Sequence, residues 1–235
     1  MVTLRLKTLR LLAQQKYATL EDLYIGSGST GNKESFRVSL YQFGLSRFSF
    51  PAVNGGVWHI AKPEIFQELE QLFPQEPIYK SIQINFNEVY HCLGMNKIRH
   101  TLLNGRRVNI QSWYSEYQLR ALPFSSRSFS YSKIPDAIFM RLLEDSTSQK
   151  CFVEYERSLK SRERYRSILK SYSYRKDVSK GSVLFICQNQ YIRNELLTVR
   201  KEVFSKGIFN EQEEIFQFIN YEQMLSDLKE ASENV

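Results

Sequence analysis

A strand, a basic helix and a second strand follow one another in the C-terminal half of the chain, and this run limits the possible folds most strongly. CFVEYE (151–156) and SVLFICQN (182–189) are strand candidates, and the second is a continuous apolar run. A helix is expected between them over 158–176, and another follows in YIRNELLTVRKEVFSK (191–206). Because parallel strands need a crossover connection, usually a helix, the run predicts a mixed sheet flanked by helices, an α/β (α+β) fold.

The segments on either side extend this sheet. A helix is expected over 85–103, followed by strands in RVNIQSWYSEYQLRA (107–121) and IPDAIFM (134–140). Residues 208–220 contain a loop and a final edge strand, and a short helix is expected around Tyr221–Leu228. The predicted order is therefore α-β-β-β-α-β-α-β, with a meander of three strands at its start.

The first part of the chain has a helical pattern instead. Leucines near helical spacing predict a helix over 3–17. ATLEDL (18–23) starts a second helix with Thr19 as its N-cap, and ESFRVSLYQFGL (34–45) contains a third. The two prolines of FPQEPIYK then mark a boundary, which predicts one domain over residues 1–78 and a second over 79–235.

A hairpin signal follows the three helices. Asn54-Gly55-Gly56 lies between two apolar runs and predicts a β-turn, and Pro63 opens a further helix. Three helices and a hairpin form the layout of a winged helix-turn-helix, whose third helix enters the DNA major groove. A helical subdomain that packs for structure or dimerisation is the alternative. With Asn54 near the wing tip, the DNA-facing candidates are Arg37, Ser39, Tyr41, Gln42 and Arg47.

The charge is distributed unevenly along the chain. The formal net charge is +7, but residues 211–235 hold seven acidic side chains against one lysine, so the other 210 residues carry +13. Such a body favours a polyanionic partner such as nucleic acid, although many ordinary soluble proteins are also basic. The three cysteines have no CxxC spacing, and the two that lie in apolar strand-like runs predict buried thiols of a reducing compartment. No apolar run approaches the ~20 residues of a membrane span, and no signal peptide opens the chain, so we expect a cytoplasmic protein.

Acidic residues recur on the three strands of the predicted meander. Glu154 and Glu156 are two residues apart and share one face of their strand. Asp136 begins the preceding strand, so hairpin pairing brings it near them, and Glu116 approaches the same end. Crowded carboxylates repel unless a cation neutralises them, and oxygen ligands suit Mg²⁺ or Mn²⁺, which polarise a phosphodiester. The alternative is a half-exposed strand whose acids arise by chance and pair with arginines such as Arg157 or Arg164.

The helix after these acids is strongly basic. Nine lysines and arginines lie between Arg157 and Lys180 against two acidic residues. A phosphate backbone passing the acidic strands would meet this face. The candidate DNA contacts on it are Lys160, Arg162, Arg164 and Arg166.

IPDAIF followed by CFVEYER and a helix resembles the PD-(D/E)XK restriction-endonuclease-like fold, whose αβββαβ core matches the predicted order. The resemblance implies a catalytic metal site at Asp136, Glu154 and Glu156, with Glu116 as a further acid. The lysine that usually ends the motif is replaced by Glu156. Lys160 or Lys170 on the next helix is the candidate to restore a positive charge.

A narrower likeness covers most of the chain. The predicted winged helix, VYHCLGMNKIRHTLLNG, WYSEYQLR, IPDAIF and FVEYERS together resemble the plasmid replication-relaxation proteins and the MOBC class of mobilization relaxases. The resemblance implies Mg²⁺- or Mn²⁺-dependent nicking of one DNA strand at an origin of transfer. It also implies contact with double-stranded and single-stranded DNA, an accessory relaxosome protein and a coupling protein. His91 matches a family position, although a packing histidine is the expected role.

The chemistry of the nick and the rival functions stay open at this stage. The nucleophile is either water or a tyrosine. The alternative to an enzyme is a non-catalytic DNA-binding protein, a replication initiator or regulator, and a third possibility is an ordinary restriction or repair nuclease. Candidate tyrosines are Tyr155, Tyr165, Tyr172 and Tyr174.

Overall fold

The computed structural model describes residues 3–51, 53–104, 109–122, 133–175, 178, 181–205 and 214–226. The chain divides into two compact units, Met1–His100 with Tyr117–Arg127, and Thr101–Glu116 with Ser128–Val235. The division falls inside one long helix, so most of that helix packs with the first unit although it follows residue 78. No helix within the described ranges combines the length and the apolar character that crossing a membrane requires.

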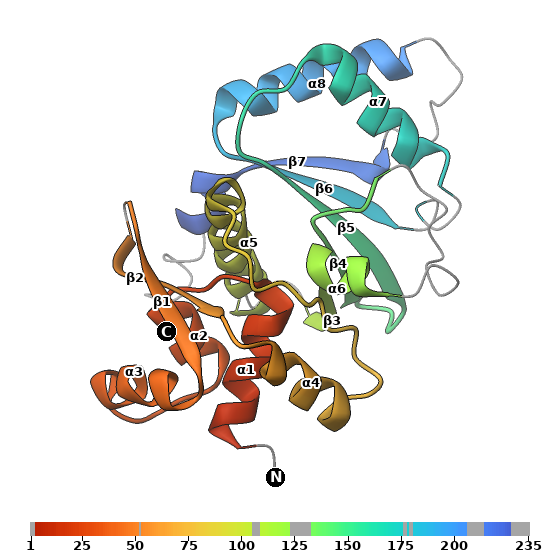
Figure 1. The fold of residues 1–235 in the computed structure, drawn as a ribbon. Helices are drawn as coiled ribbons and strands as arrows, with labels where there is room; N and C mark the ends of the chain where they lie inside the picture. Colours follow the sequence, from red (N-terminus) through yellow and green to blue (C-terminus); the bar gives the residue numbers. More distant parts are fainter. Residues whose placement is uncertain are drawn as a thin grey trace. The chain divides into compact units, whose positions relative to one another are not determined.

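The first unit contains the predicted helices and hairpin (Figure 1). Thr19 caps the second helix in a capping box with Asp22, as its sequence predicted. Asn32 caps the third helix by accepting from the N–H groups of Glu34 and Ser35. The elements are α1 (Leu4–Gln15), α2 (Leu20–Gly26), α3 (Lys33–Gln42), β1 (Leu45–Phe50), β2 (Val53–Ile60), α4 (Pro63–Leu72) and α5 (Phe86–Asn104).

One apolar core holds this unit together. Trp58 of β2 is fully buried and lies in the same cluster as Leu9 and Leu12 of α1, Leu40 of α3 and Leu69 of α4. Burial of each such side chain contributes about 1.5–3 kcal/mol. The helices and the hairpin are therefore packed around a shared interior, as a compact unit requires.

The Asn54-Gly55-Gly56 tripeptide lies inside β2 rather than at the turn of the hairpin. Phe48 pairs with Val57 and Phe50 with Val53, so three residues of β2 oppose one residue of β1. Both glycines have positive φ values, 81° and 74°, which a bulge of this kind accommodates at little cost. The predicted hairpin is confirmed, but its turn lies before these three residues, after the Phe50–Val53 pair, and not at them. Asn54 directly follows that pair and so lies near the tip.

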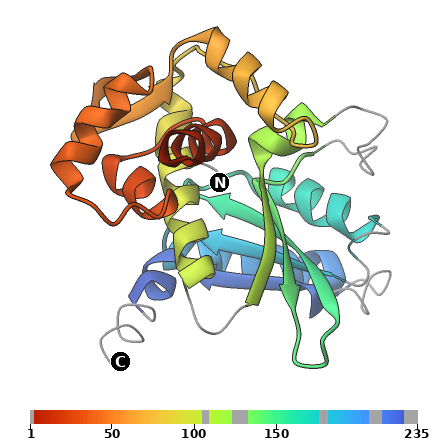
Figure 2. The same ribbon diagram turned by 90° about the horizontal axis from the view of Figure 1, so that it is seen from below.

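The second unit is built on a five-stranded sheet in the order β3-β4-β5-β6-β7 (Figures 1 and 2). The strands β3, β4 and β5 run antiparallel, whereas β5, β6 and β7 run parallel. The elements after α5 are β3 (Asn109–Ser115), α6 (Glu116–Ala121), β4 (Ala137–Leu142), β5 (Ser148–Glu156), α7 (Arg162–Ser173), β6 (Ser182–Cys187), α8 (Gln190–Phe204) and β7 (Phe216–Asn220).

Two crossover helices cover one face of this sheet (Figure 1). The helix α7 connects β5 to β6, and α8 connects β6 to β7. Tyr165, Ile168, Leu169 and Tyr172 are the buried stripe of α7, at helical spacing. The mixed sheet flanked by helices, with its meander of three strands, is therefore confirmed.

The boundary between β3 and α6 differs from the sequence prediction. The strand expected over 107–121 ends at Ser115, and Glu116 begins the short helix α6. Residues 221–226 are helical as expected, while 227–228 lie outside the described residues. Glu116 is thus the first residue of a helix and not a strand residue.

Candidate active site

Three acidic residues stand in one row across three neighbouring chain segments of the sheet. Ala137 of β4 pairs with Val153 on one side and with Ser115 on the other. The next position along the register is acidic in each segment, and directly opposed residues of antiparallel strands point to the same face. The members of this carboxylate row are Glu116, Asp136 and Glu154.

Asp136 is the centre of the row. Its N–H donates to the Val153 carbonyl at 3.1 Å, and its own carbonyl accepts from the Glu116 N–H at 2.8 Å. Its Oδ2 accepts from the Tyr155 N–H at 2.7 Å. A carboxylate oxygen of Asp136 and one of Glu116 lie within 4.8 Å of each other. The β4–β5 hairpin therefore brings Asp136 to Glu154, as the sequence predicted.

Glu154 is the buried member of this row. Its side chain is 1% exposed, one carboxylate oxygen bonds the Lys133 ammonium, and the other accepts from the Tyr172 hydroxyl. Burial raises the pKa of Glu154 to about 7 because the charged form loses its hydration, while Lys133 acts in the opposite direction. Glu154 is thus a carboxyl group with both oxygens already engaged.

Lys133 is a functional candidate that the sequence prediction missed. Burial opposes its charge, but the carboxylates of Glu154 and Asp136 outweigh that effect and raise its pKa, so it stays protonated. It lies three residues before Asp136, on the segment that leads into β4. Only lysines after Glu156 entered the prediction, because the motif places its lysine there. The short distance in sequence between Lys133 and Asp136 was the signal that could have identified it.

Glu156 has a lysine partner as well. Its side chain is 1% exposed, and the Lys160 ammonium lies 2.6 Å from its Oε1. Of the two lysines considered for this role, Lys160 is therefore the one beside a carboxylate. Lys170 is exposed, on the side of α7 opposite to Tyr172. Because Tyr172 faces Glu154, Lys170 points away from the acidic residues with which it was predicted to act.

The donor set suits a hard cation at one end of the row. Mg²⁺ and Mn²⁺ prefer carboxylate oxygens, and those of Glu116 and Asp136 are close enough for one ion to contact both. Glu154 and Glu156 are occupied by Lys133 and Lys160. The residues present therefore fit a metal at Asp136, with Glu116 rather than Glu156 beside it.

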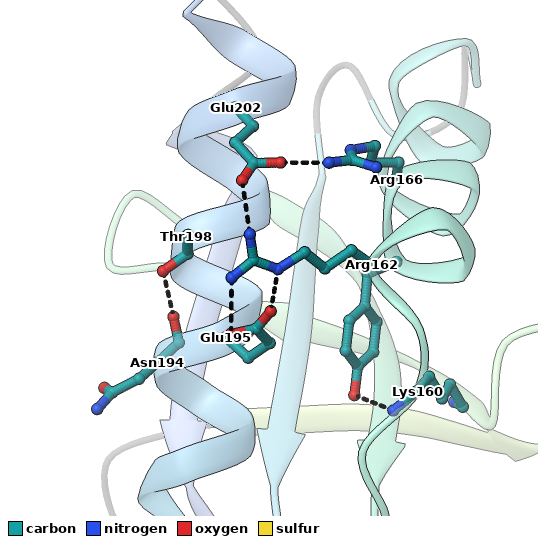
Figure 3. A network of polar contacts seen from close by, with 8 residues as sticks. Lys160, Arg162, Arg166, Asn194, Glu195, Thr198 and Glu202 are labelled. Atoms are coloured by element: carbon teal, nitrogen blue, oxygen red, sulfur yellow. Dashed lines mark hydrogen bonds and ion pairs between the residues drawn. The ribbon is translucent and has the colours of Figure 1, made fainter.

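Much of the basic helix is engaged in ion pairs with α8 (Figure 3). Arg162 pairs with Glu195 and, at 3.3 Å, with Glu202, and Arg166 pairs with Glu202 at 2.6 Å. Lys160 is held by Glu156. Of the four predicted DNA contacts, one just before α7 and three on it, Arg164 is the exposed residue that these pairs leave out. A large part of the predicted basic face is thus neutralised within the second unit.

The DNA-facing candidates of the first unit lie on α3 and β1. Tyr41 is 50% exposed and packs edge-on against Trp58, and Gln42 is exposed next to it. Arg37 pairs with Glu34 on the same helix, and Arg47 donates to the Gly55 carbonyl at 3.1 Å. The helix α3 therefore presents polar and aromatic side chains on its outer face.

The four candidate tyrosines have different environments. Burial raises the pKa of Tyr155 and of Tyr165 to about 12, and it raises that of Tyr172 well above its ordinary value. Raised pKa values leave less phenolate and make these three poor nucleophiles. Tyr174, in contrast, is 71% exposed at the end of α7.

The described residues thus contain two sets of candidate functional groups. The second unit holds the carboxylate row with Lys133 and Lys160, and the first unit presents α3 and the hairpin. His91 is half-buried on α5 and belongs to the first unit. Comparison of the chain with protein-family models, with curated proteins and with solved structures finds no match.

Proposed function

We propose that this protein is a metal-dependent DNA endonuclease that nicks one strand, a relaxase of the MOBC kind acting at an origin of transfer. The observation that carries the proposal is the carboxylate row, in which the β4–β5 hairpin and the start of α6 bring Glu116, Asp136 and Glu154 to one end of the sheet. Carboxylates in this density are costly without cations, and a nuclease site is one purpose for them.

Asp136 and Glu116 are the residues that would hold Mg²⁺ or Mn²⁺ in this proposal. A bound ion would polarise a phosphodiester and lower the pKa of a water molecule. The Tyr155 N–H holds one oxygen of Asp136 by a 2.7 Å bond and so orients this carboxylate. Lys133, with 27% of its side chain exposed, is a positive group that contacts the row at Glu154 and that solvent reaches.

Site selection is assigned to the first unit. Three helices and a hairpin in this order are consistent with a winged helix-turn-helix, and α3 would then read base edges with Tyr41 and Gln42. Arg37 and Arg47, each held by a local partner, would contact phosphates. The partners implied are duplex and single-stranded DNA, an accessory protein and a coupling protein.

A non-catalytic DNA-binding protein is the second candidate. Lys133 and Lys160 already neutralise Glu154 and Glu156, so half of the acidic group needs no metal. A replication initiator or regulator that keeps a nuclease-like sheet for structure would have this arrangement. Its DNA binding would not depend on Mg²⁺ or Mn²⁺.

Nicking of supercoiled plasmids carrying candidate origin DNA tests the proposal. The wild-type chain should convert supercoiled plasmid to open circles with Mg²⁺ or Mn²⁺, and Asp136→Asn should abolish conversion while DNA affinity is retained. Glu144→Gln is the matched control, because Glu144 is an exposed acid at the β4–β5 turn. Equal nicking by Asp136→Asn would remove the site assignment, and binding without nicking under either metal would favour the second candidate. Linear products would indicate an ordinary nuclease.

A further inference from the structure

Lys133 contacts the carboxylate row directly. Its ammonium bonds a carboxylate oxygen of Glu154, and the electrostatic influence of Asp136 and Glu156 reaches it as well. Its side chain is 27% exposed, whereas that of Glu154 is 1% exposed. The Lys133 ammonium thus holds Glu154, the buried member of the row.

The remaining oxygen of Glu154 is engaged too. The Tyr172 hydroxyl donates to it from α7, and Tyr172 is itself 1% exposed. Arg175 packs over the rings of Phe152 and Tyr172, with its guanidinium carbon 4.5 Å and 5.1 Å from the two ring centroids. Packing therefore fixes the hydroxyl that fixes Glu154, and a cation would have to displace both donors to bind this carboxylate.

We infer that Lys133 takes Glu154 out of the metal site, so that the row binds one divalent cation, through Glu116 and Asp136, and Lys133 occupies the place of a second ion. This inference rests on the proposed function, whose metal site it refines. Lys133 is a positioning residue in this scheme: it sets the number of ions and holds Glu154 in place.

Counting bound Mn²⁺ per chain, by calorimetry and by electron paramagnetic resonance of the full-length protein, tests the inference. Wild type should bind one ion, Lys133→Met should bind two, and Lys133→Arg should again bind one. Lys170→Met is the matched control, because Lys170 is an exposed lysine of α7, and it should bind one ion. One ion in Lys133→Met, or two in wild type, would overturn the inference.

Glu154→Gln provides a test that does not depend on the folding of Lys133→Met. Its amide oxygen still accepts a hydrogen bond, so the chain should keep one bound Mn²⁺, whereas Asp136→Asn should lose it. Loss of the ion from Glu154→Gln would show that Glu154 is a ligand and would overturn the inference. A wild-type chain that binds one ion but nicks no DNA contradicts the proposed function alone, and a wild-type chain that binds none contradicts both.

Discussion

The fold raises the pKa of Glu154 and so favours its uncharged form. Burial is the largest influence on its pKa and raises it to about 7; Lys133 lowers it, and Asp136 raises it. In the unfolded chain a glutamate has a pKa of about 4.3. Protonated Glu154 is therefore favoured by folding, and its ionisation is opposed by folding.

The pH dependence of stability follows from this difference. The contribution of Glu154 is fully present below pH ~4.3 and is lost as the pH rises through about 7, a change on the order of 3 kcal/mol. Urea unfolding between these pH values should show wild type losing stability relative to Glu154→Gln. If the difference in free energy of unfolding between the two proteins stays constant with pH, the raised pKa of Glu154 is contradicted. The pH dependence of the carboxyl carbon resonance of Glu154 measures that pKa directly.

Two buried tyrosines of α7 allow a hydrogen bond to a carboxylate to be compared with a hydrogen bond to the backbone. Tyr172 donates to Glu154, whereas the hydroxyl of Tyr165 accepts from the Lys160 N–H at 3.1 Å, and both side chains are buried. Above pH ~7, where Glu154 is ionised, Tyr172→Phe should lower the free energy of unfolding by about 1.5–3 kcal/mol and Tyr165→Phe by about 0.5–1.5 kcal/mol. Denaturant unfolding of both variants is the measurement, and equal losses would argue against a charged partner for Tyr172.

At the scale of elements, the bulge of β2 shows where glycine is required. A Cβ on Gly56 would lie 2.6 Å from the Phe48 carbonyl oxygen, whereas one on Gly55 would meet nothing within 4 Å. Both positions have positive φ, which costs another residue about 1–2 kcal/mol. Gly55→Ala should therefore lose about that much stability, and Gly56→Ala should lose more because backbone must move. Thermal unfolding of the pair measures the difference, and equal losses would place the strain in φ alone.

The sequence predicted most elements because their signals are local. Thr19 caps α2 and the apolar run of β6 forms a buried strand, each specified within a few residues. The Asn54-Gly55-Gly56 signal failed because a bulge and a turn use the same residues, and the register with β1 decides between them. The Asp136–Glu154 proximity was predictable because one hairpin joins them. The contact of Tyr172 with Glu154 was not, because it depends on how α7 packs against the sheet.

At the scale of the whole molecule, counting charges overstated the basic surface of α7. Arg162 and Arg166 meet Glu195 and Glu202, which are 33 to 40 residues away in sequence. Pairs at that separation arise only when α7 and α8 pack side by side, so a local pattern does not contain them (Figure 3). The +13 of residues 1–210 is therefore an upper limit on the charge that a phosphate backbone meets.

The salt dependence of DNA binding tests which charges remain for DNA, under the proposed function. Each phosphate contact with duplex DNA adds about 0.9 to the slope of log affinity against log salt. Arg164→Gln with Lys170→Gln removes two exposed charges and should reduce the slope by up to about 2. Arg162→Gln with Glu195→Gln deletes an internal pair, keeps the net charge of the chain, and should leave the slope unchanged. Fluorescence anisotropy across a KCl series measures both. If the pair deletion reduces the slope as much as the exposed double variant does, Arg162 exchanges Glu195 for phosphate on binding, and the ion pairs between α7 and α8 are the resting state of a DNA-contacting surface.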